Sequence, residues 1–234
     1  MSFISNKNLK KTAVVVFRSL LLFYILLGVF IFLFQKSFIY HPPSGQEFRD
    51  CPGFQDYQKI NYKGTRFYYK PRDSKKVLVH YHGNGGSACG QSYFKSVFER
   101  SNRSLLFVEY TGYTEKDKDP NQEDILADIR NVNEFIQKNS FQDVAVYGQS
   151  VGSGAAAYHA SRGGADSLVL VSPFSRLSDL AQSRMVIYPA SLLIREKYNN
   201  IEWLQNYQGK VVILHGSEDR VVSPRFSQKL FNNI

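Results

Sequence analysis

The feature that most constrains this fold is a serine between two glycines, placed where a strand meets a helix. The apolar run 144–147 leads into Gly148-Gln149-Ser150-Val151-Gly152 and then into a stretch rich in glycine and alanine. A residue at such a sharp turn has a strained backbone, and side chains two positions before and after it would collide. The pattern therefore predicts a strand, an exposed Ser150 hydroxyl and a helix N-terminus beneath it.

Two other interpretations of this stretch are a glycine-rich turn that happens to hold a serine, and a phosphate-binding loop. A phosphate-binding P-loop would need Gly-Lys-Ser or Gly-Lys-Thr, which is missing here. The glycine pattern that binds dinucleotides would have to follow the first strand of the domain. The strand-to-helix setting favours a nucleophilic serine over both alternatives.

The rest of the domain alternates apolar runs with amphipathic stretches. Ile125, Ile129, Val132 and Ile136 form one helical stripe that faces a sheet. Lys63-Gly64 suggests a hairpin turn. Apolar strands followed by helices indicate a mostly parallel sheet covered on both faces, and hence an α/β fold. The predicted strands are 57–62, 65–69, 77–81, 105–109, 144–147, 167–171 and 211–215, and helices are expected at 91–100, from 120, at 151–161 and at 223–231.

The N-terminal segment is long and apolar enough to cross a membrane. Residues 13–34 are broken only by Arg18, and at about 1.5 Å per residue they span roughly 33 Å. A cleaved signal peptide is the alternative, but no small-x-small cleavage site follows the run. We expect an uncleaved signal anchor after a short basic N-terminus (1–12). The basic residues before it put the N-terminus in the cytoplasm and the main domain on the non-cytoplasmic side of the membrane.

Charge and cysteine content exclude some other classes. The formal charge is +9, of which the first forty residues account for +5, so the remainder carries only a mild surplus without a nucleic-acid motif. We therefore expect no nucleic-acid partner. No zinc or CxxC pattern is present, and neither a metal nor a cofactor is expected. Cys51 and Cys89 could pair in an oxidising compartment or stay free thiols.

Three motifs together resemble the α/β-hydrolase superfamily: His82-Gly83-Asn84-Gly85-Gly86, the Ser150 motif, and the run from His215 to Val222. With the N-terminal anchor and Tyr40-His41-Pro42-Pro43, the chain is similar to the membrane-anchored Bem46-like branch, which includes the ABHD13- and ABHD17-type serine hydrolases. The resemblance covers nearly all of residues 36–234. It implies the α/β-hydrolase fold and an acyl hydrolase acting on esters or thioesters.

The resemblance and the chemistry of acyl transfer assign roles to four residues. Ser150 is the expected nucleophile. The backbone N–H of Val151 is expected to stabilise the oxyanion, and by resemblance Asn84 supplies the second donor. Asp219, which follows a predicted strand, is the expected acid that orients a histidine; Glu218 beside it is a competitor.

The histidine that should complete this triad is not found where the fold requires it. It should follow the acid after a further helix and strand. All histidines of the sequence precede Asp219, and each is expected to be structural: His41, His80, His82, His159 and His215. Three explanations are open, namely a shortened form of a longer enzyme, a base from another subunit, and an inactive relative. We favour the first, since the last strand and helix of the fold are missing as well.

The sequence thus predicts a connector at 35–57 and a hydrolase domain at 58–234, with a possible cap over the serine at 172–209. A helix packed on the sheet is the alternative for this segment. The expected function is a membrane-anchored serine hydrolase (esterase, lipase or thioesterase) that cleaves acyl-lipid or acyl-protein substrates through a Ser150 acyl-enzyme. The alternative is an inactive binding or scaffold protein with the same fold.

Overall fold

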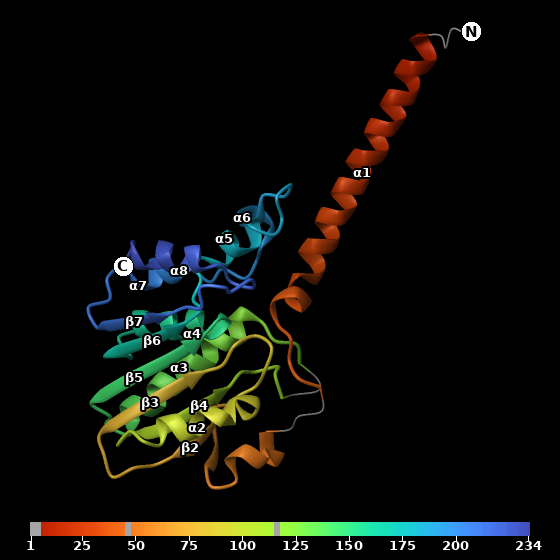
Figure 1. The fold of residues 1–234 in the computed structure, drawn as a ribbon. Helices are drawn as coiled ribbons and strands as arrows, with labels where there is room; N and C mark the ends of the chain where they lie inside the picture. Colours follow the sequence, from red (N-terminus) through yellow and green to blue (C-terminus); the bar gives the residue numbers. More distant parts are fainter. Residues whose placement is uncertain (1–5, 45–47, 115–117) are drawn as a thin grey trace.

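The computed structural model describes residues 6–44, 48–114 and 118–234. One long helix, α1 (Asn6–Ile39), projects from an α/β domain (Figure 1). It continues past the apolar run into the segment that the sequence suggested as an irregular connector. The remainder of that segment holds two short 3-10 helices, η1 (Phe48–Asp50) and η2 (Pro52–Phe54).

The domain is built on a seven-stranded sheet in the order β1-β2-β4-β3-β5-β6-β7. The first two strands form the expected hairpin, in which Lys63 and Gly64 both have positive φ, at 51° and 91°. β2 pairs antiparallel with β4, and the remaining pairs are parallel. The strands are β1 (Gln58–Tyr62), β2 (Thr65–Lys70), β3 (Lys76–Tyr81), β4 (Ser104–Glu109), β5 (Asp143–Gln149), β6 (Ser167–Val171) and β7 (Lys210–Leu214).

Helices lie on both faces of the sheet, as predicted (Figure 1). The larger apolar core includes the stripe of α3 (Gln122–Lys138) and the alanines of α4 (Val151–Ser161). A smaller core joins η1 and η2 to the η3 helix (Cys89–Phe94) and to aromatic side chains of β2 and β4. The further helices are α2 (Lys95–Phe98), α5 (Leu177–Gln182), α6 (Ala190–Leu193), α7 (Asn200–Leu204) and α8 (Pro224–Phe231).

The single helix expected at 91–100 is instead two short pieces, η3 and α2. The backbone at Gln91 is not helical, with φ −100° and ψ 16°. The Cys51–Cys89 disulfide ties Cys89, the first residue of η3, to the segment before β1. A regular helix that began at residue 91 would not include Cys89. Tertiary constraint therefore outweighs the weak helical pattern of this stretch.

The segment 172–209, for which the sequence left a cap or a packed helix open, holds three short helices: α6 contacts α1, whereas α7 packs against α4 (Figure 1). Its base is tied to the end of α1 by a buried polar cluster. The Tyr40 hydroxyl donates to the Glu196 carboxylate and lies 3.1 Å from the Tyr198 hydroxyl. The Gln122 N–H donates to the same carboxylate at 2.7 Å. These contacts fix α1, the cap and α3 against one another.

Candidate active site

Ser150 occupies a strained position between β5 and α4. Its φ of 53° and ψ of −117° lie outside the regions that residues with a side chain normally adopt. A Cβ at Gly148 would lie 2.2 Å from the Gly152 carbonyl oxygen, and a Cβ at Gly152 would lie 2.3 Å from the Tyr81 carbonyl oxygen. Both glycines are therefore required by close backbone approach, as the sequence pattern of this turn predicts. We call the turn Gly148–Gly152 the elbow.

The strain at Ser150 is held by backbone hydrogen bonds on both sides. The Ser150 N–H donates to the Val171 carbonyl oxygen at 2.9 Å, which links the elbow to the end of β6. The Ser150 carbonyl oxygen accepts from the N–H and the hydroxyl of Ser153, at 2.9 and 2.6 Å. The turn is thus fixed while the side chain of Ser150 stays at the surface of a cleft.

That cleft lies between the elbow and the glycine-rich loop after β3, and its volume is about 460 Å³. An added Cβ on Gly83 would lie 3.7 Å from the Ser150 Cβ, so the loop passes directly over the serine. The loop and the elbow therefore face each other across a space large enough for an ester group. Residues of both segments line it, among them Gly83, Asn84, Gly85, Gln149 and Ser150.

Asn84 lies in this cleft and is held by the end of α1. Its carbonyl oxygen accepts from the His41 N–H at 3.0 Å and from the Tyr113 hydroxyl at 3.1 Å. Its side-chain amide donates to the Ile39 carbonyl oxygen at 3.2 Å. These bonds engage the carbonyl oxygen and the side chain of Asn84, and the oxyanion role of its backbone N–H stays a prediction.

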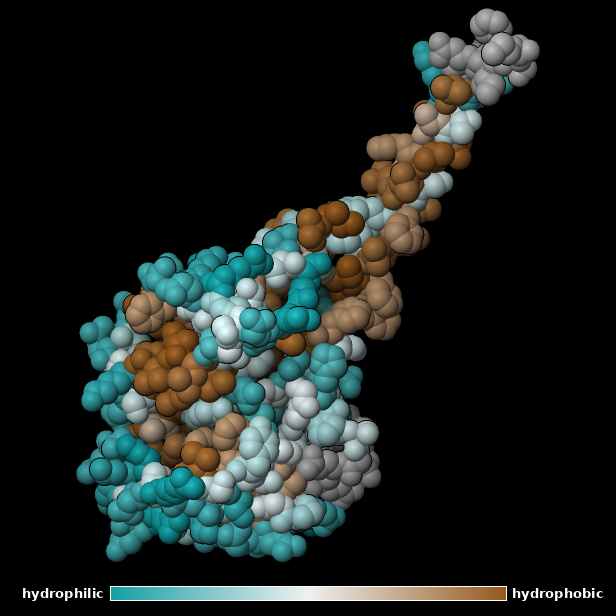
Figure 2. Space-filling model, in the orientation of Figure 1, coloured by the Kyte–Doolittle hydropathy of each residue, from teal (hydrophilic) through white to brown (hydrophobic). Residues whose placement is uncertain are grey.

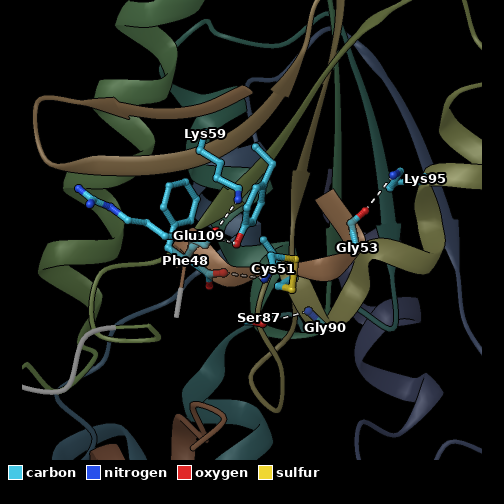
Figure 3. The surroundings of a disulfide bond; sticks show 12 residues. Phe48, Cys51, Gly53, Lys59, Ser87, Gly90, Lys95 and Glu109 are labelled. Atoms are coloured by element: carbon cyan, nitrogen blue, oxygen red, sulfur yellow. Dashed lines mark hydrogen bonds between the residues drawn. A yellow bond between two sulfur atoms is a disulfide. The ribbon is translucent and has the colours of Figure 1, made fainter. Parts of the chain in front are cut away.

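A buried pair braces the loop from below. The Nε2 atom of His82 lies 3.3 Å from a Glu109 carboxylate oxygen, and neither side chain is exposed to solvent. The other carboxylate oxygen of Glu109 accepts from the Ala88 N–H at 3.2 Å. Figure 3 shows Glu109 beside Cys51, whose disulfide to Cys89 closes the same region. His82 is therefore buried among contacts that hold this loop, in line with the structural role expected for each histidine.

Asp219 lies two strands away from Ser150, in the loop after β7. One of its carboxylate oxygens accepts from the N–H groups of Val221 and Val222, both at 2.9 Å. Burial alone would raise the Asp219 pKa, but hydrogen bonds from Val222, Ser172 and Val221 lower it below its usual value. Asp219 is thus held as a carboxylate, the form that orients an imidazole.

Asp219 is not among the residues that line the described cleft with Ser150. Ser172 connects the two regions, because its N–H donates to the Leu214 carbonyl oxygen at 2.8 Å and its side chain bonds Asp219. Ser172 follows Val171, the strand end that accepts from the Ser150 N–H. Ser150 and Asp219 thus lie at the carboxyl ends of β5 and β7, with the end of β6 between them.

The histidines of the structure lie in five separate environments. Burial lowers the pKa of His80 to about 3 and that of His159 to about 4, so both are neutral, and His159 bonds the Tyr81 hydroxyl at 2.8 Å. His215 lies 3.4 Å from Asp219, but its Nε2 atom donates to the Val222 carbonyl oxygen at 2.7 Å. His41 contacts the Asn84 side chain at the edge of the loop.

Two features of the site have little signal in the sequence. Cys51 and Cys89 pair across 38 residues, a choice that the sequence left open. Ser172, which has a positive φ of 46°, contacts the acid, and only its place directly after a strand could have indicated it. Among the described residues, no cluster of three His, Cys, Asp or Glu side chains could hold a metal ion.

Comparison with known sequences finds distant relatives. No family model matches the sequence. The chain is 26% identical over 217 residues to the uncharacterized protein Rv2307c of Mycobacterium tuberculosis, with 87% of this chain and 77% of that protein covered. It is 25% identical over 170 residues to human alpha/beta hydrolase domain-containing protein 17C, with 69% and 49% covered. The chain thus spans about half the length of the latter relative.

Comparison with solved structures gives the fold. The esterase PF2001 of Pyrococcus furiosus superposes with a TM-score of 0.61 at 15% identity, over 83% of this chain and 84% of that one. The Butyrivibrio proteoclasticus enzyme Est1E, solved with ferulic acid, gives 0.60 at 17% identity, over 75% and 85%. This chain is therefore an α/β-hydrolase-fold protein that resembles the ABHD17-type hydrolases.

Proposed function

We propose that this chain is a membrane-anchored serine hydrolase that cleaves carboxylic esters or thioesters, of the acyl-lipid or acyl-protein type, through a Ser150 acyl-enzyme. The observation that carries the proposal is the backbone of Ser150, with φ 53° and ψ −117° at a strand-to-helix turn. Strain of this kind is kept where the surrounding structure over-determines it and the strain has a use. Here it presents one hydroxyl to a cleft roofed by a glycine-rich loop.

The proposed reaction follows from that placement. The Ser150 oxygen attacks the carbonyl carbon of the substrate and gives up its proton to a general base, while the carbonyl electron pair moves onto the oxygen. The Val151 and Asn84 N–H groups stabilise the resulting oxyanion. Collapse expels the alcohol or thiol, which takes the proton, and leaves an ester on Ser150. Water then repeats the sequence and releases the acid.

The general base is assigned to none of the five histidines. His80, His82 and His159 are buried in the domain, and His215 uses its Nε2 atom on the Val222 carbonyl. In this proposal Asp219 orients an imidazole contributed by a second subunit. The competing proposal is a binding or scaffold protein with the same fold.

The proposed anchor is α1, whose apolar surface is exposed along most of its length (Figure 2). The buried Cys51–Cys89 disulfide supports a domain on the non-cytoplasmic side, because such bonds persist in oxidising compartments. Basic residues before the apolar run support the same orientation.

A fluorophosphonate probe tests the enzyme proposal directly. The detergent-solubilised chain is expected to label covalently, and Ser150→Ala is expected to abolish labelling, because the probe reacts with an activated serine oxygen. Ser161→Ala is the matched control, since Ser161 lies at the far end of the same helix and is exposed. This control should label like the parent chain. If a folded parent chain stays unlabelled, the claim that residues 1–234 are an active hydrolase as they stand fails, and the binding or scaffold protein becomes the better account.

A further inference from the structure

The cap carries an uncharged stretch that packs against the apolar helix α1. Residues 185–194 contain no charged side chain, and Arg184 and Arg195 bracket them. Three apolar side chains of this stretch are unusually exposed, at 83% for Val186, 66% for Ile187 and 79% for Leu192. Exposed apolar groups of this kind mark an interaction surface.

The position of this stretch along α1 is fixed by specific contacts. The rings of Tyr24 and Tyr188 stack at 4.5 Å, with 9° between their planes. The Tyr24 hydroxyl donates to the Ile187 carbonyl oxygen at 2.9 Å, and the Tyr188 hydroxyl donates to the Tyr24 carbonyl oxygen at 2.7 Å. Closer to the domain, the Gln35 amide donates to the Leu193 carbonyl oxygen at 3.2 Å. Residues 185–194, which we call the tip, thus lie along α1 from Gln35 back to Tyr24.

These contacts determine how deep the tip would lie in a bilayer that α1 crosses. Tyr24 lies ten residues before Phe34, the end of the apolar run, and hence near the middle of residues 13–34. At about 1.5 Å per residue, Tyr24 lies roughly 15 Å along the helix from that end, about half the thickness of the hydrocarbon core. If α1 crosses a bilayer along its normal, whatever is bound at Tyr24 lies inside the hydrocarbon.

Several polar groups of residues 185–194 are hydrogen-bonded within the protein. The Gln182 side chain donates to the carbonyl oxygens of Met185 and Tyr188, both at 3.0 Å, and accepts from the Ala190 N–H at 2.9 Å. The two tyrosine hydroxyls bond across to α1 as described. Backbone and hydroxyl groups that are satisfied inside the protein are what a non-helical segment needs at membrane depth.

An apolar groove of about 360 Å³ separates the tip from α1. Ile25, Val29 and Phe32 line one wall, and Tyr188, Pro189 and Leu193 line the other. At the outer rim the Arg195 guanidinium lies 4.8 Å from the Phe32 ring, where its charge can reach lipid headgroups. The apolar lining of the groove suits a lipid acyl chain, and the groove lies beside the exposed side chains of the tip.

We propose that residues 185–194 are a second membrane-embedded element, inserted beside α1 into the leaflet on the domain side, with a bilayer lipid's acyl chain in the groove between them. This inference rests on the proposed anchor and deepens the proposed function. The end of α1 is hydrogen-bonded through the Ile39 carbonyl oxygen to Asn84, which lines the cleft, so the cleft would lie on the membrane-facing side of the domain and take acyl compounds resident in the membrane.

Site-directed fluorescence tests this insertion. Both native cysteines are paired, so a single introduced cysteine is the only free thiol. Ile187→Cys reports on the tip, Phe30→Cys on exposed α1 and Val97→Cys on exposed α2, far from α1 in Figure 1. Each full-length variant carries an environment-sensitive nitrobenzoxadiazole dye in phosphatidylcholine vesicles, with or without a nitroxide on the acyl chains.

The nitroxide should quench the Ile187 dye to an extent comparable with the Phe30 dye and well beyond the Val97 dye. Quenching at Phe30 with Ile187 no more quenched than Val97 overturns the inference while the anchor stands. If none of the three is quenched, the anchor and the inference fail together. Fluorophosphonate labelling of the same samples reports on Ser150 separately, so a failed hydrolase proposal is not confused with a failed insertion.

Discussion

At the residue scale, the site depends on one strained serine and one stabilised carboxylate. A disfavoured backbone such as that of Ser150 costs on the order of 1–3 kcal/mol. The hydrogen bonds to Val171 and Ser153 hold it in place. Asp219, in contrast to the strained Ser150, is stabilised by its surroundings, because three hydrogen-bond donors favour its charged form and hold the loop after β7.

The pKa of Asp219 leads to a pH dependence of stability. Because its folded pKa lies below the usual value of about 3.9, the carboxylate stabilises the folded state fully above about pH 4. This contribution is lost as the pH falls through the lower folded pKa. Asp219→Asn should therefore lower the melting temperature at pH 7, with a loss of about 1 kcal/mol, and the difference from the parent chain should shrink towards pH 3.

Thermal unfolding of both chains at pH 7, 4 and 3 measures this difference. A difference that stays constant or grows on acidification would contradict the assigned role of the charge. Glu218→Gln is the matched control, since Glu218 is the exposed neighbour of Asp219 and should show little effect at any of these pH values.

At the element scale, the loop over Ser150 depends on its neighbours. It follows β3, is held to the end of α1 through Asn84, and leads into η3, whose first residue is Cys89. The smaller core packs around the disulfide, with Phe54 stacked on Tyr68 at 4.3 Å. The loop is therefore fixed by a covalent bond on one side and by the end of α1 on the other.

Removing the disulfide tests this arrangement. The double variant Cys51→Ser and Cys89→Ser should lose about 2–4 kcal/mol of unfolding free energy, because the bond closes a loop with a sequence separation of 38. Denaturant unfolding in detergent, with and without a reductant, measures the loss. The reductant should destabilise the parent chain and leave the double variant unchanged; equal responses of the two chains would show that the pair does not stabilise the domain.

At the scale of the whole molecule, the protein combines an apolar helix with a domain that has an apolar area of its own. α1 carries most of the exposed apolar side chains, and its end is hydrogen-bonded to the loop that lines the Ser150 cleft. A second apolar area lies over the β6–β7 edge of the sheet, where Val212 and Leu214 are about half exposed (Figure 2). The first area fits a membrane, and nothing in the structure shows what covers the second.

The proposed orientation of the domain has a test in the sequence itself. Asn102-Arg103-Ser104 is an acceptor motif for N-glycosylation, and Asn102 is exposed in the turn before β4. When the chain is made in the presence of microsomes, a luminal domain should gain a glycan that an endoglycosidase removes. Asn102→Gln should prevent this gain. Digestion of the domain by protease added to sealed microsomes would instead place it in the cytoplasm.

The sequence by itself determined the succession of the seven strands, the helices α3, α4 and α8, and the position of the turn at Ser150. These features are local: Gly148 and Gly152 are needed wherever a strand turns sharply into a helix, and the apolar periodicity of residues 125–136 requires a face to pack on. The superfamily resemblance and the α/β fold followed from the same motifs. The roles of Ser150, Val151, Asn84 and Asp219 remain predictions, which the labelling experiment tests first.

The tertiary structure alone decided which distant segments meet. The disulfide, the contact of Ser172 with Asp219 and the position of the cap against α1 join residues 38, 47 and more than 150 positions apart. No local propensity encodes such pairs, since they form only when the sheet order and the packing of α1 bring the segments together. For the same reason the sequence indicated only that residues 185–194 could belong to a cap. Their position beside Tyr24 of α1 was decided by the folded structure.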